Sequence, residues 1–270
     1  MIPVAVKNVP LYFQSFMFSL FIYLVNAANI DNFELHPKKR INKYLAHRGV
    51  GSRREIDKLI EMNLVKVNGE LASSGQKVDK NDKIEINGKL IEGYTEKKVY
   101  FMLNKPQGYI SAVKDMRAKT VVELVDVPER IYPVGRLDLN TEGLLILTND
   151  GDLYNKIIHP RAEIWKTYIA KVWGRVTEEE IIKLQEGIDL EDGVTLPAKV
   201  NLQRAYDNSS WVEISIREGR NRQVRRMLKA IGHHVIYLKR EKLGELTVEG
   251  LEVGQYRELY QEELDYIFSL

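Results

Sequence analysis

Residues Gly135–Gly151 read GRLDLNTEGLLILTNDG, a stretch that joins a polar turn to a short apolar run. Within it Asp138–Gly143 favours a turn, because Asp, Asn and Gly supply the side-chain hydrogen bonds and backbone conformations that turns need. The run Leu144–Thr148 predicts a short buried strand, which Asn149–Gly151 closes. Asp138 is therefore expected at the turn that leads into a buried strand.

The same turn also fits the first half of an EF-hand calcium loop, with oxygen ligands at positions 1, 3 and 5 and glycine at position 6. Position 12 of that loop would be Asn149, whose side chain lacks the carboxylate that binds calcium through two oxygens. The chain has no cysteine, and its five histidines are scattered. No metal site and no disulfide are expected.

On both sides of this stretch, strands and helices mix without a regular strand–helix–strand repeat. This pattern predicts an α+β fold with a mainly antiparallel, mixed sheet flanked by helices. The expected strands are Val99–Leu103, followed by a turn at Asn104–Gly108, and the alternating runs Lys166–Val172 and Ser210–Ile216. The expected helices run from a cap at Thr177 to about Gln185, and from Asn221 to Ile231, where Gly232 ends the helix.

Residues 37–95 carry the signals of a separate small module. A short amphipathic helix over Ile41–Arg48 is expected to end at Gly49, and Ser52–Glu55 forms a capping box that opens a second helix. Two later dipeptides, Asn68-Gly69 and Asn87-Gly88, favour tight hairpin turns between short strands. The module is therefore predicted to contain two helices and a small sheet, with cations near the helix starts.

Residues 1–36 form an apolar extension that the fold does not require. The segment 8–30 has no charged residue and is long enough for a membrane span or a signal sequence, but several Ser, Asn and Gln residues dilute it. A non-native extension from a misassigned start, a targeting or membrane segment, and a helix docked on the fold all remain open.

The formal net charge of +2 hides two basic segments. Residues 37–94 hold 13 lysines and arginines against 8 acids, and residues 217–242 hold 9 against 2. Two separated basic surfaces are typical of a protein that binds a polyanion, although solvated surface charge would give the same counts.

The stretch RINKYLAHRGVGSRREIDKLIEMNLVKVNGE (Arg40–Glu70) resembles the S4 domain, a small RNA-binding module. An S4 domain binds RNA through its shape and phosphates more than through its bases. The resemblance implies that the following residues contact RNA: Arg40, Lys43, Arg48, Ser52, Arg53, Arg54 and Lys58.

The opening stretch closely resembles the catalytic motif of the RsuA/RluB family of ribosomal pseudouridine synthases. Three further segments resemble motifs of this family and occur in its order: LNKPQG (Leu103–Gly108), KTY (Lys166–Tyr168) and REGRNRQVRRM (Arg217–Met227). The resemblance divides the chain into the extension 1–36, an S4-like domain over 37–95, a catalytic domain over 96–265 and a short tail over 266–270.

The resemblance implies an isomerase that converts uridine in RNA to pseudouridine without a cofactor. It implies that Asp138 is the nucleophile, that Arg220 pairs with Asp138 and orients it, and that Tyr168 stacks on the uracil and takes part in proton removal. Further residues are expected to bind RNA or to position loops or phosphate: Lys105, Arg136, Lys166, Arg222, Arg225 and Arg226.

The segment EGRNRQVRRM is closer to the large-subunit (RluB) form of its motif than to the small-subunit form. The expected partner is therefore 23S ribosomal RNA, free or within an assembly intermediate. A 16S enzyme and a non-catalytic RNA-binding assembly factor are the alternatives. We expect a cytoplasmic monomer that does not associate with membranes.

Overall fold

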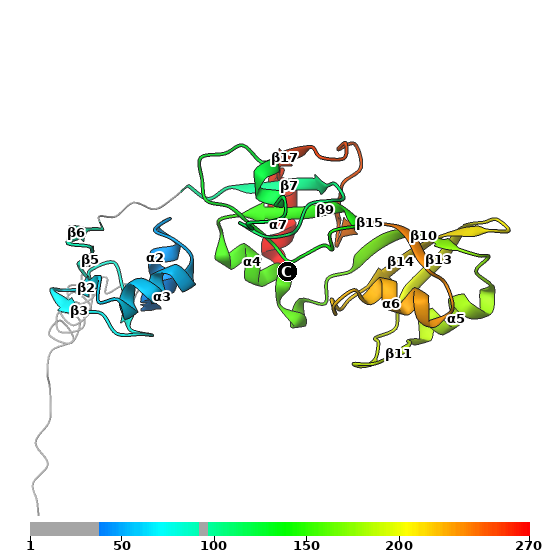
Figure 1. The fold of residues 1–270 in the computed structure, drawn as a ribbon, viewed down its shortest axis with the longest axis horizontal. Coiled ribbons are helices and arrows are strands. Elements are labelled where there is room, and N and C mark those ends of the chain that lie inside the picture. The colour runs from blue at the N-terminus through cyan, green and yellow to red at the C-terminus, as the bar shows by residue number, and fades with distance from the viewer. Residues whose placement is uncertain (1–37, 92–96) are drawn as a thin grey trace, which may run out of the picture.

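The computed structural model describes residues 38–91 and 97–270, which form a small module and a large domain (Figure 1). The small module holds helices α2 (Ile41–Ala46) and α3 (Arg53–Glu61) and a four-stranded sheet in the order β3-β2-β5-β6. Its strands are β2 (Val65–Val67), β3 (Glu70–Leu71), β5 (Ile84–Ile86) and β6 (Lys89–Leu90), while β1 (Lys39–Arg40) pairs with β4 (Lys77–Val78).

The local signals of the small module are confirmed. The Glu55 N–H donates to Oγ of Ser52 at 3.2 Å, and the Ser52 N–H donates to Oε2 of Glu55 at 2.6 Å, which is the predicted capping box. Asn68 and Gly69 have φ values of 53° and 88°, and each lies between paired strands. Two successive positive φ angles are what a type I′ hairpin turn requires, so the asparagine–glycine pair sets the register of β2 and β3.

A nine-stranded sheet forms the centre of the large domain, in the order β13-β14-β10-β15-β9-β7-β17, with β16 beside β15 and β8 beside β9. Only β15 and β9 run parallel, so the predicted α+β class with a mainly antiparallel sheet is confirmed. The strands are β7 (Tyr100–Lys105), β8 (Tyr132–Pro133), β9 (Glu142–Thr148), β10 (Lys166–Trp173), β13 (Lys199–Ala205), β14 (Ser209–Ile216), β15 (Val235–Leu243), β16 (Leu246–Thr247) and β17 (Tyr256–Glu258).

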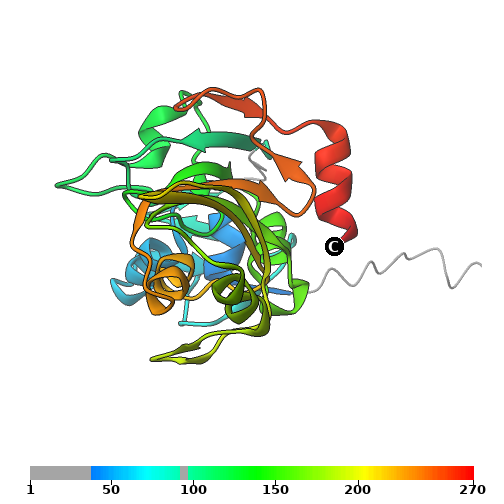
Figure 2. The ribbon, with the colours of Figure 1, turned by 90° about the vertical axis from the view of Figure 1, so that its right-hand side faces the viewer.

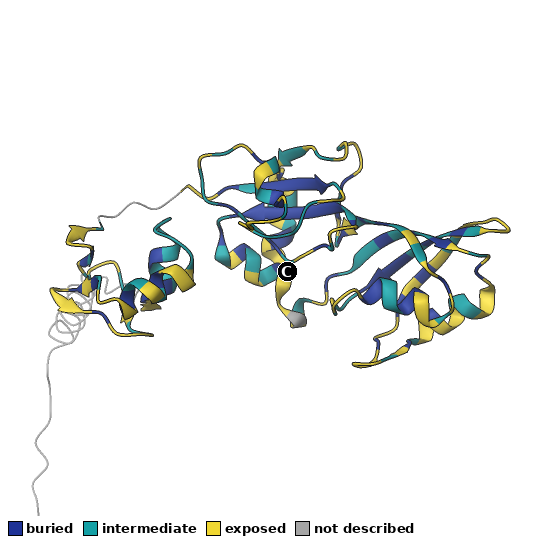
Figure 3. Ribbon diagram, viewed as in Figure 1, coloured by how far each residue is buried: buried dark blue, intermediate teal, exposed yellow. Residues whose placement is uncertain are grey.

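Strand β9, which follows the turn at residues 138–141, is buried on both faces. Leu145 and Leu147 point into one apolar core, and Leu144 and Ile146 point into the other. Figure 3 shows β7 and β9 as the most deeply buried part of the sheet. Burial on both faces explains why this strand has a continuous apolar run instead of an alternating pattern.

Helices cover both faces of the sheet. Helices α5 (Glu178–Glu186) and α6 (Gln223–Ala230) lie on one face of β13, β14 and β10, whereas α4 (Gly151–Ile158) and α7 (Gln261–Ser269) pack together near β7 and β9 (Figures 1 and 2). A short hairpin, β11 (Asp189–Leu190) with β12 (Gly193–Val194), extends beside α6, and the 3-10 turns η1 (Val121–Leu124) and η2 (Pro160–Ala162) complete the domain.

Three expectations about elements need correction. The predicted tail 266–270 belongs to helix α7, and the side chain of Ile267 is fully buried in the second core, so the domain does not end at residue 265. Gly151 closes β9 and also begins α4, because the Asp150 carboxylate accepts the Asp152 N–H at 2.9 Å and caps the helix. Helix α6 begins at Gln223, since Arg222 before it has a left-handed backbone with φ 49°.

The extension 1–36 and most of the segment between the domains lie outside the described residues. Among the residues that the structure describes, no helix is both long and apolar enough to cross a membrane.

Candidate active site

A cleft of about 1630 Å³ lies between the small module and the large domain and extends along the sheet. Many of the side chains that line the cleft are cationic. From the small module it is lined by Lys43, His47, Ser52, Arg53 and Arg54, and from the large domain by Arg136, Asp138, Lys166, Tyr168, Arg217, Arg220, Arg222, Arg225 and Arg240, among others.

Asp138 lies in the loop between β8 and β9 and is 29% exposed through its side chain. Two arginines from the start of α6 approach it. Nη1 of Arg222 lies 3.4 Å from Oδ2 of Asp138, and Nε of Arg225 lies 3.8 Å from the same oxygen. Both contacts are ion pairs between an arginine and the Asp138 carboxylate.

The loop that carries Asp138 is held through its backbone. All four carbonyl oxygens from residue 138 to residue 141 accept a hydrogen bond. Lys105 donates to those of Asp138 at 3.1 Å and Thr141 at 2.9 Å, the Gly108 N–H donates to that of Leu139 at 2.8 Å, and Arg225 donates to that of Asn140 at 2.8 Å. The loop therefore has a fixed conformation in which Asp138 faces the cleft.

Lys105 is the most deeply buried cation of this site, with no exposed surface. Its Nζ atom lies 2.9 Å from the backbone oxygen of Pro106, in addition to its two bonds to the loop. Burial lowers the pKa of Lys105 to about 8, although the nearby Asp138 and Glu142 carboxylates act in the opposite direction. Lys105 does not line the cleft, so it acts on the loop and not on RNA.

Gly143, at the end of the loop, lets two strands approach closely. Its φ of 108° lies in the region that favours glycine, and a Cβ atom there would overlap the backbone of Arg240 in the parallel strand β15. The close approach places Arg240 in the floor of the cleft, where its Nε donates to the Leu144 carbonyl at 2.9 Å.

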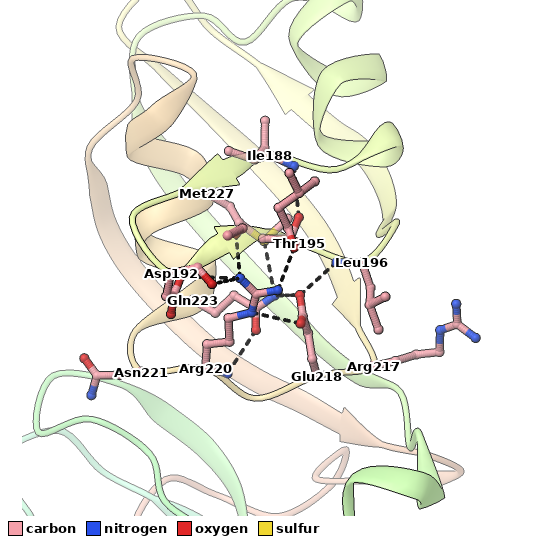
Figure 4. Close-up of polar contacts among 12 residues, drawn as sticks. Ile188, Asp192, Thr195, Leu196, Arg217, Glu218, Arg220, Asn221, Gln223 and Met227 are labelled. Atoms are coloured by element: carbon pink, nitrogen blue, oxygen red, sulfur yellow. Dashed lines mark hydrogen bonds and ion pairs between the residues drawn. The ribbon is translucent and has the colours of Figure 1, made fainter.

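The predicted pairing of Arg220 with Asp138 is wrong. The Arg220 guanidinium faces the β11–β12 hairpin and donates to the carbonyl oxygens of Gly193 and Val194, both at 2.6 Å, while its Nε donates to Oε2 of Glu218 at 3.0 Å (Figure 4). A guanidinium that is held by this many acceptors cannot also reach the cleft carboxylate. Arg222 and Arg225 make the ion pairs with Asp138 that were predicted for Arg220.

Arg226 also faces the hairpin. Its two terminal nitrogens lie 2.8 and 2.9 Å from the two carboxylate oxygens of Asp192, and these bonds lower the pKa of Asp192 to about 2. Arg226 does not line the cleft, whereas Arg136 is exposed and does.

Tyr168 and Lys166 lie on the same face of β10, as the alternating pattern predicted. Tyr168 is 9% exposed and lines the cleft. Nζ of Lys166 donates to the carbonyl oxygens of Ile164 at 3.1 Å and Arg217 at 3.3 Å. Burial, and after it the charge of Arg240, lowers the pKa of Lys166 to about 8.

The structure separates the predicted RNA contacts of the small module into two groups. Lys43, Ser52, Arg53 and Arg54 line the cleft, whereas Arg40, Arg48 and Lys58 do not. Lys43 also lies 3.3 Å from Asp152 at the start of α4, and Arg48 stacks on the Tyr44 ring at 3.7 Å. Among the described residues, no three His, Asp or Glu side chains are grouped to hold a metal ion.

Arg240 was not predicted from the sequence, and Arg225 was predicted only as an RNA contact. The Arg225 side chain lines the cleft, is 10% exposed and also lies beside Asp138. Helical spacing could not have shown this role, because Arg222 lies before the first residue of α6 and has a left-handed backbone. Arg240 carried no signal, since only the tertiary approach of β15 to Gly143 brings it to the cleft.

A carboxylate held by arginines, in a cleft with cations from two domains, is the arrangement of an enzyme that acts on a polyanion. The sequence pattern of the RNA pseudouridylate synthase family matches residues 99–230, and that of the S4 domain matches residues 39–84. The chain belongs to the RNA pseudouridine synthase family, and the isomerase and S4-domain expectations are confirmed.

Relatives cover most of the chain. The chain is 48% identical over 237 residues to a ribosomal large subunit pseudouridine synthase B of Bacillus subtilis (strain 168). This alignment covers 86% of this chain and 96% of the relative. The chain is 36% identical over 232 residues to the dual-specificity RNA pseudouridine synthase RluF of Escherichia coli (strain K12), covering 86% of this chain and 79% of that protein. A crystal structure of a pseudouridylate synthase, 35% identical, superposes with a TM-score of 0.63 over 84% of this chain and 99% of the other.

Proposed function

We propose that this enzyme converts one uridine of ribosomal RNA to pseudouridine and that Asp138 is its nucleophile. The observation that carries the proposal is the position of the Asp138 carboxylate, which faces the cleft between Arg222 and Arg225 on a loop fixed by four backbone hydrogen bonds. A group held in one geometry needs little reorganisation when it reacts.

The reaction breaks the bond between C1′ of the ribose and N1 of uracil, turns the base, and joins C5 to C1′. N1 gains a hydrogen and C5 loses one, so the reaction is an isomerisation that needs no redox partner. Asp138 acts as an ionised carboxylate, either by bonding to the nucleoside or by stabilising the separated sugar. Arg225 and Arg222 orient it, a role that we move from Arg220 because of the geometry above.

Tyr168 is proposed to stack on the uracil, with its phenol taking part in proton removal. Its position in the cleft wall, 9% exposed, supports contact with a base that enters from the open side. The target base must first leave its stack, which costs a few kcal/mol. Contacts of RNA phosphates with Arg53, Arg54, Arg136 and Arg222 offset that cost.

The proposed substrate is 23S ribosomal RNA, free or in an assembly intermediate. Its support is the Bacillus subtilis relative, which is a ribosomal large subunit pseudouridine synthase, together with the EGRNRQVRRM form of the basic motif. We also propose that the enzyme works in the cytoplasm as a monomer.

The test uses the purified enzyme with 23S and 16S ribosomal RNA tritiated at C5 of uridine. Release of tritium from 23S RNA is expected, with none from Asp138→Asn and normal release from Asp126→Asn, an exposed carboxylate outside the cleft. Mapping of pseudouridine in total RNA of cells with and without the gene then identifies the site. Release only from 16S RNA would move the substrate to the small subunit, and RNA binding without release would favour an assembly factor.

A further inference from the structure

Five buried side-chain polar atoms of the described residues have no hydrogen-bond partner, and three of them are arginine nitrogens in the cleft. These three are Nε of Arg217, Nε of Arg225 and Nη2 of Arg240. Arg217 pairs with Glu163 at 3.0 Å, and Arg225 faces Asp138. Arg240 is left without an acid, and buried donors without partners are rare enough to need an explanation.

Arg240 is 5% exposed, and within the described residues its side chain makes one hydrogen bond, from Nε to the Leu144 carbonyl. No carboxylate among residues 38–91 and 97–270 lies within ion-pair distance of its guanidinium. A buried charge without a counter-ion destabilises the folded protein. Arg240 lines an open cleft, so a negatively charged ligand can enter and neutralise its charge.

A second cation accompanies Arg240. Arg240 is the cross-strand neighbour of Tyr168, and Lys166 lies two residues away on the same face of β10. The contacts of Lys166 are two carbonyl oxygens, which do not neutralise it, and the charge of Arg240 contributes to the lowered pKa of Lys166. The nearby Glu163 carboxylate is already bound by Arg217. Buried Arg240 and half-buried Lys166 carry charges of the same sign without an acid between them, and together they form a site for an anion.

We infer that Arg240 and Lys166 form a buried phosphate site that binds the backbone phosphate of the target uridine next to Tyr168. This inference rests on the proposed function, because the anion that this cleft receives is then RNA. A guanidinium and an ammonium together match the charge and the oxygen acceptors of a phosphodiester. The phosphate is fixed in the floor of the cleft, and the uracil, which the ribose joins to this phosphate, reaches Tyr168.

The experiment measures binding of uridine 5′-monophosphate and of uridine to the full-length enzyme by calorimetry. The two probes differ only in the phosphate. Wild type is expected to bind the monophosphate at least about 10-fold more tightly than uridine, which is the range of a charge-assisted hydrogen bond. Arg240→Met should abolish this difference, and Lys166→Met should reduce it.

The matched control is Lys239→Met. Lys239 precedes Arg240 on β15, does not line the cleft and pairs with Glu241 at 3.7 Å, so this variant should keep the wild-type preference. The melting temperature gives a second readout. Arg240→Met should melt no lower than wild type without ligand, because the substitution removes an unpaired buried charge, and inorganic phosphate should stabilise wild type more than the variant.

Equal binding of both probes to wild type, or an unchanged preference in Arg240→Met, would overturn the phosphate site. A lower melting temperature of Arg240→Met with an unchanged preference would show that the arginine is structural. If Arg240→Met fails to fold, Lys166→Met provides the test. The preference of that variant for uridine 5′-monophosphate over uridine must then be smaller than that of wild type. Binding of these probes needs no catalysis, so an enzyme that binds the monophosphate but modifies no RNA would refute the proposed function and leave the site standing.

Discussion

Nε of Arg225 lies 3.8 Å from Oδ2 of Asp138 and has no hydrogen-bond partner, although it is buried. The rest of the guanidinium is anchored to the carbonyl of Asn140 at 2.8 Å and to that of Val235 at 3.4 Å. This donor is therefore held near the carboxylate without being used elsewhere. Hydrogen bonds in active sites often shorten only when the substrate is bound.

Arg225→Lys is expected to lower kcat about 100-fold with little change in KM. Lysine keeps the positive charge, but it cannot hold Asn140 and also present a donor to Asp138. A misplaced reacting group costs about 100-fold in rate. Steady-state tritium release measures both constants. Lys229→Gln, an exposed position one turn later on α6, should behave as wild type. A rise in KM alone would identify Arg225 as an RNA ligand.

The stability of the enzyme should depend on Lys105 above pH 8. The pKa of Lys105 is about 8 in the folded state, against 10.5 for an ordinary lysine, so between these values the unfolded state binds more protons and stability rises with pH. Relative to Lys105→Met, which does not titrate there, the free energy of unfolding of wild type should increase by about 1–3 kcal/mol from pH 8 to pH 10. Urea unfolding of both proteins at several pH values measures this difference. A constant difference over this range would mean that Lys105 keeps an ordinary pKa.

RNA binding should depend strongly on salt despite the small net charge. The double variant Arg53→Gln/Arg54→Gln removes two cations that line the cleft. It should reduce the slope of log affinity against log salt concentration by roughly 2, because each lost phosphate contact removes about one released counter-ion. Filter binding with ribosomal RNA measures the slope. Lys66→Gln/Lys89→Gln serves as the control, since these residues lie on the small sheet outside the cleft and should leave the slope unchanged.

Tyr168→Phe should separate the two proposed tasks of this residue. Phenylalanine keeps the ring, so affinity for RNA should stay within about twofold, while loss of the hydroxyl should lower kcat by about 100-fold if the phenol takes part in proton removal. Tyr168→Leu should weaken binding as well, because it also removes the stacking surface. An unchanged kcat in Tyr168→Phe would restrict Tyr168 to stacking.

Local signals predicted much of the fold. The capping boxes at Ser52 and Thr177 and the turn at Asn68-Gly69 act within four residues, so the sequence alone specifies them. Helix α4 was missed because Asn149–Gly151, which was predicted only to close the strand, also supplies the cap Asp150 and the first residue of the helix. The tail was misjudged because burial of Ile267 depends on α4, which is more than one hundred residues away.

The candidate site was predicted less completely, because side-chain direction depends on tertiary contacts. The arginines 220, 222, 225 and 226 look equivalent in the sequence, yet two face the hairpin and two face Asp138. The left-handed backbone at Arg222 separates these directions, and no residue preference predicts it for arginine. Lys105 and Lys166 were expected to position loops or phosphate, and the structure shows which backbone atoms they hold.

Four hydrogen bonds that fix the Asp138 loop end on its main-chain oxygens, and this has a consequence for how the enzyme can change. The side chains of Leu139 and Asn140 are exposed and take no part in holding the loop. Substitutions at these two positions can therefore alter which RNA surface fits beside Asp138 while its carboxylate stays where it is. Substrate choice and chemistry are physically separable within a loop of four residues.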